Sequence, residues 1–309
     1  MDSPTIFVGI PSYRDPELLQ TINDCIQCAD RPDRLAFGIC NQHDEQTRLN
    51  NSADDWRIKN VSYPNSKGLG WARETVRGLY RGEDYILQLD SHMRFRRGWD
   101  TYLLTVFTEA VDAGISRPLI SASCRPWDPR RPGNLDPTGV KICFGGFSDR
   151  RLIKYKPQAI SDVESRRRFI PGVFVSGHFI FASGDFYQKL YFDSVVFFEE
   201  EIPLTLRSFS LGYDVIHPTE SFVFHLYERD YRELFWSDVL TEKQGQGQEL
   251  MQERRRIQVR RAQQLCEIKD WGIDLGNCGL GDDRSLDEWI KRAHIDIRRQ
   301  RIIGPEAML

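Results

Sequence analysis

The residues best suited to chemistry are Asp90 and His92, which stand two apart directly after the apolar run 84–89. In an open α/β sheet, ligands gather at the carboxyl ends of the strands. A carboxylate oxygen and an imidazole nitrogen released at such an end can bind one divalent ion, and manganese accepts this mixture of ligands. An aspartate that caps the following helix would give the same pattern, so the motif alone leaves both interpretations open.

A glycine-containing turn precedes the same strand by one predicted helix. In the segment 65–73 (NSKGLGWAR), Gly68 and Gly70 allow the backbone to approach a ligand closely. Arg73 follows on the first helical turn, where it can meet a phosphate or a base. Ordinary ion pairing at the surface is the alternative role for Arg73.

The end of the first predicted strand carries a second polar cluster. Pro11, Ser12, Tyr13 and Arg14 follow the apolar run 5–10 and offer a hydroxyl, an aromatic face and a guanidinium. Because the carboxyl ends of parallel strands meet at one edge of a sheet, we expect this cluster near Asp90. For Arg14 too, a surface ion pair is the alternative.

Three consecutive carboxylates, Glu199, Glu200 and Glu201, stand at the start of a predicted helix. Acidic side chains are favourable in a first helical turn because of the helix dipole. Alternatively, one of them faces a site and contacts a substrate hydroxyl or stabilises positive charge at a reacting carbon. His225 ends a later apolar strand, and it becomes a metal ligand only if the fold brings it to Asp90 and His92.

The elements that must position these residues alternate between strands and helices over the first two-thirds of the chain, which is typical of an α/β sheet. The run 125–157 is rich in Pro, Gly and Arg and is predicted to be a long lid or substrate loop. From about residue 243 we predict a polar, arginine-rich helix. Predicted strands are 5–10, 34–40, 58–63, 84–89, 119–123, 214–217 and 222–225, an apolar segment spans 169–182, and predicted helices are 16–29, 70–81, 99–113 and 202–211.

Composition narrows the function class. The 309 residues are 40% hydrophobic and 28% charged, with a formal net charge of −3, which argues against a dedicated nucleic-acid binder. The start of the chain has no signal-peptide pattern, and no apolar run reaches the roughly 18–20 residues of a membrane span. Cys25 and Cys28 form a CxxC on a predicted helix without a second pair to complete a zinc site. We therefore expect a cytoplasmic enzyme or binding domain.

Taken in order, several segments resemble one family of enzymes. They are VGIPSYRD, NSKGLGWAR, LQLDSHMRF, VSGHFIFASGDF, FFEEEIPLTLRSFSLGYDVIHP, FHLYER and RSLDEWIKRAHID. Together they are similar to the GT-A-type UDP-GlcNAc:polypeptide (hydroxyproline) N-acetylglucosaminyltransferases and, more distantly, to the polypeptide GalNAc-transferases. The resemblance extends from about residue 5 to residue 297. It implies a nucleotide-diphospho-sugar transferase fold, with a Rossmann-like mixed sheet flanked by helices and a helical C-terminal extension.

The resemblance also implies an activity and a site. The enzyme would move GlcNAc from UDP-GlcNAc to a hydroxyl of a protein or glycan, retaining the anomeric configuration. Asp90, His92 and His225 would hold Mn²⁺ or Mg²⁺ against the diphosphate, where the metal stabilises the departing UDP. Glu200, Glu201 and Asp90 would be the catalytic residues. Donor-binding residues would be Pro11, Ser12, Tyr13, Arg14, Gly68, Arg73, Asp90, Ser91, Gly177 and His178.

Several alternatives stay open at this stage. The family pattern has glycine where Glu199 stands, so it is open which of the three glutamates face the site. We prefer Glu200 and Glu201. The donor can instead be UDP-GalNAc, UDP-Gal or UDP-Glc in polysaccharide synthesis, or the chain can be a sugar-nucleotide-binding module without turnover. We predict a catalytic domain over 1–240 and a helical extension over 241–309. The acceptor side would be formed by the loop 125–157 and the basic tail.

Overall fold

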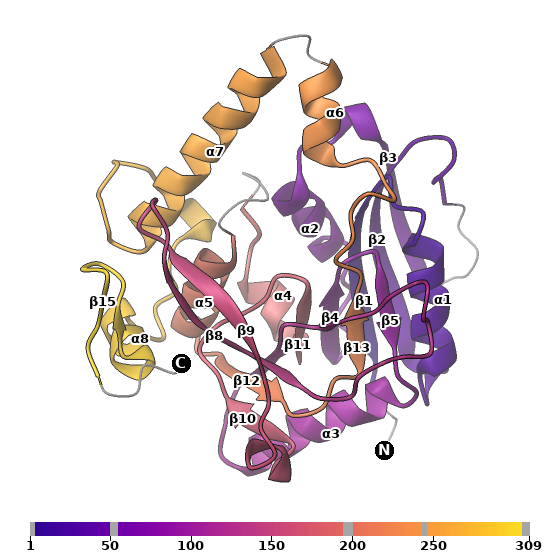
Figure 1. Ribbon diagram of the computed structural model, residues 1–309, viewed down its shortest axis with the longest axis horizontal. Coiled ribbons are helices and arrows are strands. Elements are labelled where there is room, and N and C mark those ends of the chain that lie inside the picture. The colour runs from indigo at the N-terminus through magenta and orange to yellow at the C-terminus, as the bar shows by residue number, and fades with distance from the viewer. Residues whose placement is uncertain (1–3, 50–54, 194–199, 243–245, 305–309) are drawn as a thin grey trace.

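An eight-stranded mixed sheet forms the centre of the computed structural model, which describes residues 4–49, 55–193, 200–242 and 246–304 (Figure 1). The strand order is β10-β12-β6-β11-β4-β1-β2-β3. The half formed by β4, β1, β2 and β3 is parallel, whereas β11 runs antiparallel to both β4 and β6. The strands are β1 (Ile6–Tyr13), β2 (Leu35–His43), β3 (Trp56–Ser62), β4 (Tyr85–Leu89), β6 (Pro118–Ser121), β10 (Phe169–Pro171), β11 (Phe179–Ser183) and β12 (Asp214–Pro218).

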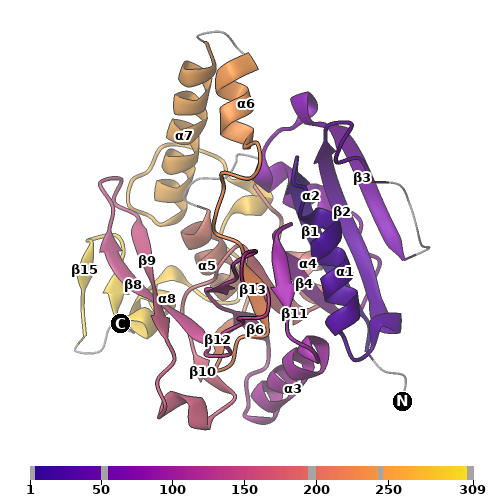
Figure 2. The same cartoon turned by 45° about the vertical axis from the view of Figure 1, so that its right-hand side comes forward.

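Helices cover both faces of this sheet, as the predicted α/β class requires (Figure 2). Side chains alternate between the faces of a strand, so Ile6 and Val8 of β1 pack with α1 and α3, whereas Phe7 packs with α2 and α4. Each of these fully buried side chains contributes roughly 1.5–3 kcal/mol to folding. The helices are α1 (Leu18–Cys28), α2 (Leu69–Arg77), α3 (Trp99–Asp112) and α4 (Asp185–Lys189).

A second, three-stranded sheet joins three distant parts of the chain. Its order is β5-β13-β7, formed by Met93–Phe95, Val223–His225 and Arg125–Pro126. His225 pairs with Met93 across the antiparallel β5–β13 ladder. This register brings His225 beside His92, although 133 residues separate them in the sequence.

The prediction that residues 125–157 form one long loop is wrong over much of this segment. Its first half keeps the irregular, Pro- and Gly-rich character, apart from β7, but Val140–Phe147 and Ile153–Ala159 form the antiparallel hairpin β8–β9. The strands were hidden because the Pro, Gly and Arg residues around them dominate the composition of the segment. Gly146, at φ +104°, lies in the bulge that interrupts this ladder.

The remaining helices are α5, which precedes β12, and α6, α7 and α8, which follow β13. α5 and α7 pack with α8 and the hairpin around a separate apolar cluster that contains Trp289 and Phe174. The sequence reasoning did not predict α6. α8 lies within the helical extension predicted over 241–309, and Ser285 and Glu288 form a capping box at its start. None of the described helices is both long and apolar enough to cross a bilayer. These elements are α5 (Glu201–Ser210), α6 (Phe235–Glu242), α7 (Gln246–Leu265), α8 (Leu286–Ala293), β14 (Ile295–Asp296) and β15 (Arg301–Ile302).

Candidate active site

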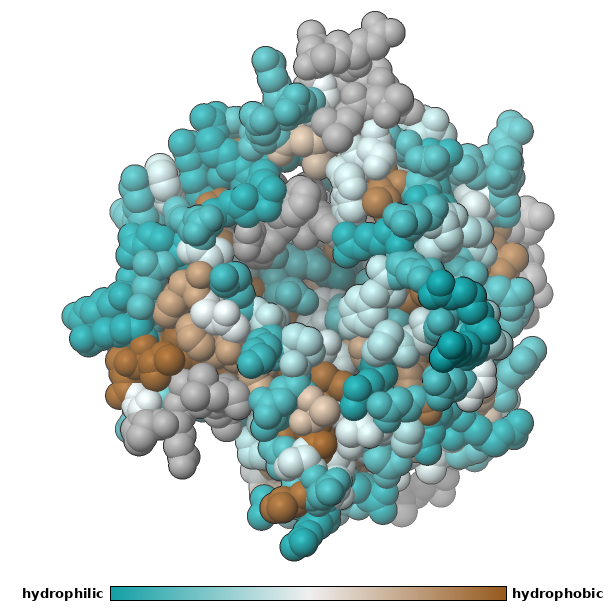
Figure 3. All heavy atoms as spheres, viewed as in Figure 1, coloured by the Kyte–Doolittle hydropathy of each residue, from teal (hydrophilic) through white to brown (hydrophobic). Residues whose placement is uncertain are grey.

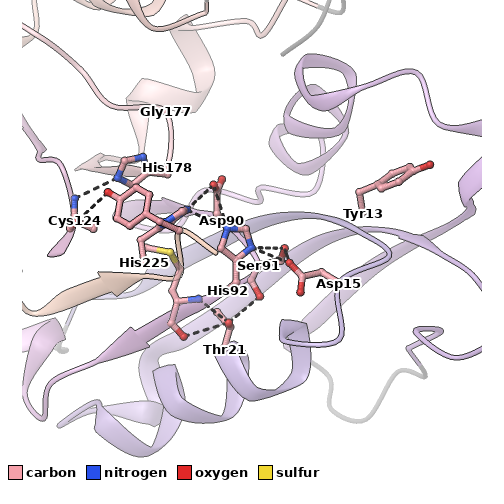
Figure 4. A network of polar contacts seen from close by, with 12 residues as sticks. Tyr13, Asp15, Thr21, Asp90, Ser91, His92, Cys124, Gly177, His178 and His225 are labelled. Atoms are coloured by element: carbon pink, nitrogen blue, oxygen red, sulfur yellow. Dashed lines mark hydrogen bonds and ion pairs between the residues drawn. The ribbon is translucent and has the colours of Figure 1, made fainter. Parts of the chain in front are cut away.

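Asp90, His92 and His225 converge at the carboxyl end of β4 (Figure 4). The Nε2 atoms of the two histidines lie 3.0 Å apart, and His225 Nε2 lies 3.3 Å from Asp90 Oδ2. Among the described residues, these three form a group whose potential ligand atoms all lie within 4.8 Å of one another. The structure therefore brings together the three side chains that the family resemblance assigns to one metal site.

Asp15 orients the central histidine of this group. His92 Nδ1 lies 2.8 Å from Asp15 Oδ2, and the Ser91 hydroxyl donates to the same carboxylate oxygen at 2.7 Å. An ionised carboxylate accepts a hydrogen bond only from a protonated nitrogen, so Nδ1 carries the proton and Nε2 turns its lone pair toward the site. Burial raises the pKa of the Asp15 carboxyl, but the contact with His92 and the charge of Arg232 outweigh it, and the pKa lies below its ordinary value.

Backbone contacts fix the turn that carries His92. The Thr21 hydroxyl donates to the Ser91 carbonyl at 2.8 Å and accepts from the Met93 amide at 2.9 Å (Figure 4). Trp127 Nε1 donates to the His92 carbonyl at 3.1 Å. Side chains from α1 and from the segment after β7 thus hold the turn in place before any ligand arrives.

This donor set fits a divalent metal ion. Two imidazole nitrogens and one carboxylate oxygen suit manganese or zinc, and the lone pair of His92 already faces inward. Burial raises the pKa of Asp90, but the hydrogen bond with His225 and the charge of Arg73 outweigh it and hold the carboxyl ionised. The carboxylate–histidine pair formed by Asp15 and His92 is a usual second layer around a metal.

A pocket opens beside this group at the ends of β1 and β4, and we call it the strand-end pocket. Its volume is about 100 Å³. Gly68, at φ +104°, starts α2 there, a backbone conformation that favours glycine. Gln42 also lines the pocket, and its side-chain amide donates to the Ser12 carbonyl at 2.9 Å. The lining comprises Pro11, Ser12, Tyr13, Gln42, Gly68, Leu69, Asp90, Ser91, His92, His225, Arg229, Arg232, Leu234, Phe235 and Trp236.

Arg14 lies beside this pocket and is not among its lining residues. Its guanidinium pairs with Asp44 at 3.0 Å and with Asp238 at 2.8 Å, over the ring of Tyr63. Asp238 also accepts from the Tyr13 hydroxyl at 2.7 Å. These contacts tie α6 to the end of β1, so the segment after His225 lies across the pocket.

A wider opening lies on the other side of Asp90, toward the hairpin β8–β9, and we call it the hairpin-side cavity. It measures about 540 Å³. The face seen in Figure 3 is hollowed near its middle, where hydrophilic side chains predominate. The lining comprises Leu69, Arg73, Asp90, Ile153, Lys154, Tyr155, His178, Glu200, Glu201, Ile202, His225, Tyr227 and Arg229.

Arg73 lies at the base of this cavity, almost fully buried. Its guanidinium contacts Glu200 at 2.5 Å, Asp90 at 3.8 Å and the Gly177 carbonyl at 2.8 Å. A Cβ on Gly177 would lie 2.8 Å from Glu200 Oε1, so only glycine fits there without displacing the pair. Arg73 thus links two carboxylates rather than standing free for a ligand.

His178 and the two described glutamates complete the cavity wall. The Cys124 amide donates to His178 Nε2 at 3.2 Å, and burial lowers the pKa of this histidine to about 3, so it is neutral. Burial, with the charge of Glu200, raises the pKa of Glu201 to about 7. Burial also raises the pKa of Glu200. Glu199 lies outside the described residues.

Sequence reasoning missed several residues of these two openings. Asp15 was inside the quoted VGIPSYRD motif but received no role, although an acidic residue directly after a strand-end cluster was a usable signal. Arg229 ends the quoted FHLYER motif but received no role. Arg232 and Trp236 follow the predicted ligand His225 closely in the sequence, and that proximity was their only signal. Tyr155 had none, because the hairpin that carries it was not predicted.

Comparisons with known proteins complete the description. A family model described as Glycosyltransferase (GlcNAc) matches residues 5–61 and 49–299. A search of curated proteins found no match to this sequence.

Among solved structures, the chain is similar to GalNAc-T7 crystallised with UDP, GalNAc and Mn²⁺, with 13% identity and a TM-score of 0.55. The match covers 74% of this chain and 45% of the other, so the chain spans less than half the length of GalNAc-T7. S. aureus TarS 1-349 in complex with UDP has 13% identity and a TM-score of 0.45, covering 77% of this chain and 66% of TarS. Its complex with UDP-GlcNAc has 11% identity and a TM-score of 0.47, covering 76% and 64%.

Proposed function

Because the chain belongs to the GlcNAc glycosyltransferase family and has the GT-A fold predicted from its sequence, we propose that it transfers GlcNAc from UDP-GlcNAc to a hydroxyl of a protein or glycan. The observation that carries this proposal is the convergence of Asp90, His92 and His225 between the strand-end pocket and the hairpin-side cavity. The narrower resemblance to the hydroxyproline-directed enzymes stays a prediction.

The donor nucleotide would occupy the strand-end pocket. Tyr13 and Trp236 offer aromatic surface for a base, and Arg229 and Arg232 offer charge for a diphosphate. Arg229 lines both openings, which suits a group that holds the diphosphate at the junction between them. Asp90, His92 and His225 would hold Mn²⁺ or Mg²⁺, which when bound supplies Lewis-acid stabilisation of the departing diphosphate.

The sugar and the acceptor would occupy the hairpin-side cavity. Retention requires the acceptor oxygen to approach the sugar carbon from the face that UDP leaves. In that step the bond from the carbon to the phosphate oxygen breaks, the bond to the acceptor oxygen forms, and the hydroxyl proton passes to the departing phosphate oxygen. Glu200 and Glu201 line this cavity, where a carboxylate can bind sugar hydroxyls and stabilise positive charge at the reacting carbon.

The decisive measurement is UDP release from UDP-GlcNAc with Mn²⁺, with Mg²⁺ and with a chelator. We expect turnover that depends on the metal and is lost in Asp90→Ala. The control is Asp282→Ala, which removes an exposed carboxylate from the loop before α8 and should leave turnover unchanged. If Asp90→Ala folds normally, by circular dichroism and thermal unfolding, and keeps wild-type turnover, the metal assignment is wrong.

The choice of sugar needs a separate test, because the similar GalNAc-T7 was crystallised with GalNAc. Calorimetric titration with UDP-GlcNAc, UDP-GalNAc, UDP-Gal and UDP-Glc ranks the donors directly. We expect UDP-GlcNAc to bind most tightly. Preference for another sugar would point to the alternative transferase, and binding without hydrolysis or transfer would point to a module that has lost turnover.

A further inference from the structure

The two histidines of the proposed metal site differ in the surroundings of the ring nitrogen that faces away from it. His92 Nδ1 lies 2.8 Å from Asp15 Oδ2. His225 Nδ1 is buried, and among the described residues it has no hydrogen-bond partner. A histidine that binds a metal is usually oriented by a hydrogen bond from its other nitrogen. The imidazole of His225 must therefore be oriented in another way.

Two aromatic rings pack against this imidazole. The ring of Tyr227 lies 4.3 Å from the ring of His225, centroid to centroid, and is tilted by 53° to it. The ring of His178 lies 4.8 Å from the ring of His225 and is tilted by 46°. The rings of Tyr227 and His178 are themselves 6.2 Å apart and nearly perpendicular, so they meet His225 on adjacent sides. Such tilted contacts favour particular ring orientations.

The backbone of one residue anchors both of these rings. The Tyr227 hydroxyl donates to the Cys124 carbonyl at 2.8 Å. The Cys124 amide donates to His178 Nε2 at 3.2 Å (Figure 4). Cys124 is buried, so these anchors lie away from solvent. The two rings are therefore held in place without the help of a ligand.

We propose that Tyr227 is a positioning residue of the metal site, whose ring holds the imidazole of His225 in its ligating orientation. In that orientation His225 Nε2 lies 3.3 Å from Asp90 Oδ2 and 3.0 Å from His92 Nε2. The Tyr227 hydroxyl is engaged by the Cys124 carbonyl, so the residue acts through His225. This inference rests on the metal assignment of the proposed function.

The test is the affinity of the full chain for Mn²⁺, measured by titration of the free ion by electron paramagnetic resonance without any donor. Tyr227 is 45% exposed, so Tyr227→Leu removes the ring at little risk to folding. Its affinity for Mn²⁺ should fall about tenfold, as for other residues that orient a metal ligand. Tyr227→Phe keeps the ring and should keep most of the affinity.

Tyr80→Leu is the matched control. The Tyr80 hydroxyl also donates to a backbone carbonyl, that of Glu83 at 2.7 Å. Its ring packs against Phe7, near the opposite end of β1 from the strand-end pocket. The affinity of Tyr80→Leu for Mn²⁺ should equal that of the wild type.

The nitrogen couplings of bound Mn²⁺, measured by pulsed electron paramagnetic resonance, separate positioning from a general loss of structure. The wild type should show two imidazole nitrogens. Tyr227→Leu should show one, that of His92, because Asp15 still orients that ring. Should Tyr227→Leu fail to fold, by circular dichroism, Tyr227→Met takes its place with the same expectations.

The outcomes separate this inference from the proposed function. If the wild type binds no Mn²⁺, the metal assignment of the proposed function is wrong, and this inference falls with it. If the wild type binds Mn²⁺ and Tyr227→Leu binds it equally well with both nitrogens, this inference alone is overturned. An equal loss in Tyr227→Phe and Tyr227→Leu would also overturn it, because the ring would then play no part.

Discussion

The strand-end pocket and the hairpin-side cavity meet at Asp90, but their polar groups are held differently. Around the pocket, Asp15 receives hydrogen bonds from both His92 and Ser91, and Thr21 fixes the turn between them. Around the cavity, Glu201 has a pKa of about 7 because burial and the charge of Glu200 both oppose its ionisation. Asp15 and His92 in the first region are matched in charge and hydrogen bonding, whereas the second region contains carboxylates that their surroundings only partly stabilise.

This difference follows from how the two regions are built. The pocket lies on strand ends of the central sheet, where buried neighbours fix each side chain. The cavity lies between α5 and the hairpin β8–β9, which belong to a separate apolar cluster (Figure 1). The pre-formed geometry of the pocket suits the binding of the same donor and the same metal in every reaction cycle. Carboxylates that the protein stabilises only in part can gain their remaining hydrogen bonds from a sugar or acceptor hydroxyl when it binds.

The largest effect should come from removing Arg73, the arginine buried against Asp90 and Glu200. Arg73→Leu leaves Glu200 and Asp90 without their buried cation, so the free energy of unfolding should fall by about 3–5 kcal/mol. Denaturant unfolding measures this change. The control Arg168→Leu breaks an exposed pair with Glu109 and should cost less than about 1 kcal/mol. Equal losses in the two variants would contradict the central place of Arg73.

The matched character of the strand-end pocket is tested at Asp15. Asp15→Asn presents an amide to His92 Nδ1 and no longer selects the orientation that leaves Nε2 unprotonated. The affinity for Mn²⁺ should fall about 10- to 100-fold, as measured by titration of the free ion by electron paramagnetic resonance. Asp44→Asn, which alters the nearby pair with Arg14, should leave this affinity unchanged. An unaltered Kd in Asp15→Asn would show that His92 is oriented without the carboxylate.

The partly matched character of the hairpin-side cavity is tested by pH. Because the pKa of Glu201 is raised from 4.5 to about 7, the folded state holds a proton that the unfolded state loses. Stability should therefore fall as the pH rises from 4.5 to 7 and then stay lower. The groups that act on Glu201 are Glu200, Arg73 and Asp90. In Glu201→Gln, the fall in the free energy of unfolding between pH 4.5 and pH 7 should be smaller by about 1–2 kcal/mol. This value is discounted for the contact of Glu201 with solvent.

Thermal unfolding of both proteins at pH 5 and pH 8 measures this effect. Glu201→Gln should approach the wild type at pH 5 and exceed it at pH 8. A parallel pH dependence in the two proteins would place the titrating group elsewhere.

The smallest effect should come from the contact that ties α6 to β1. Asp238→Asn weakens the ion pair with Arg14 while leaving an acceptor for the Tyr13 hydroxyl. A partly buried pair is worth up to about 1 kcal/mol, so the KM for the donor should rise about two- to fivefold while kcat changes little. A double-mutant cycle with Arg14→Met separates this pair from the neighbouring contact with Asp44. A fall in kcat alone would mean that α6 does not act through donor binding.

Much of the central sheet could be predicted from the sequence, for a local reason. Strands such as the one predicted over 5–10 are nearly continuous apolar runs, typical of strands buried on both faces, and polar residues mark their ends. The positions of Asp90 and His92 at a strand end followed from this pattern alone, as did the glycine at the start of α2. The division into domains 1–240 and 241–309 stays a prediction.

The site itself depended on contacts between distant segments. His225 joins His92 only through the β5–β13 register, and Asp15 reaches His92 from the end of β1. Such pairings are set by packing of the whole chain and leave no periodic signal in a single segment. The same holds for Tyr155, whose place in the cavity depends on a hairpin that its Pro- and Gly-rich surroundings concealed.

The sequence by itself thus determined the α/β class, the strand ends and the residue types suited to a metal and a nucleotide, because these follow from short apolar runs and their polar boundaries. Only the tertiary structure decided which partners surround those residues. It brought Asp15 to His92 and gave Glu201 its raised pKa, since both depend on contacts and solvent exclusion by elements far apart in the chain.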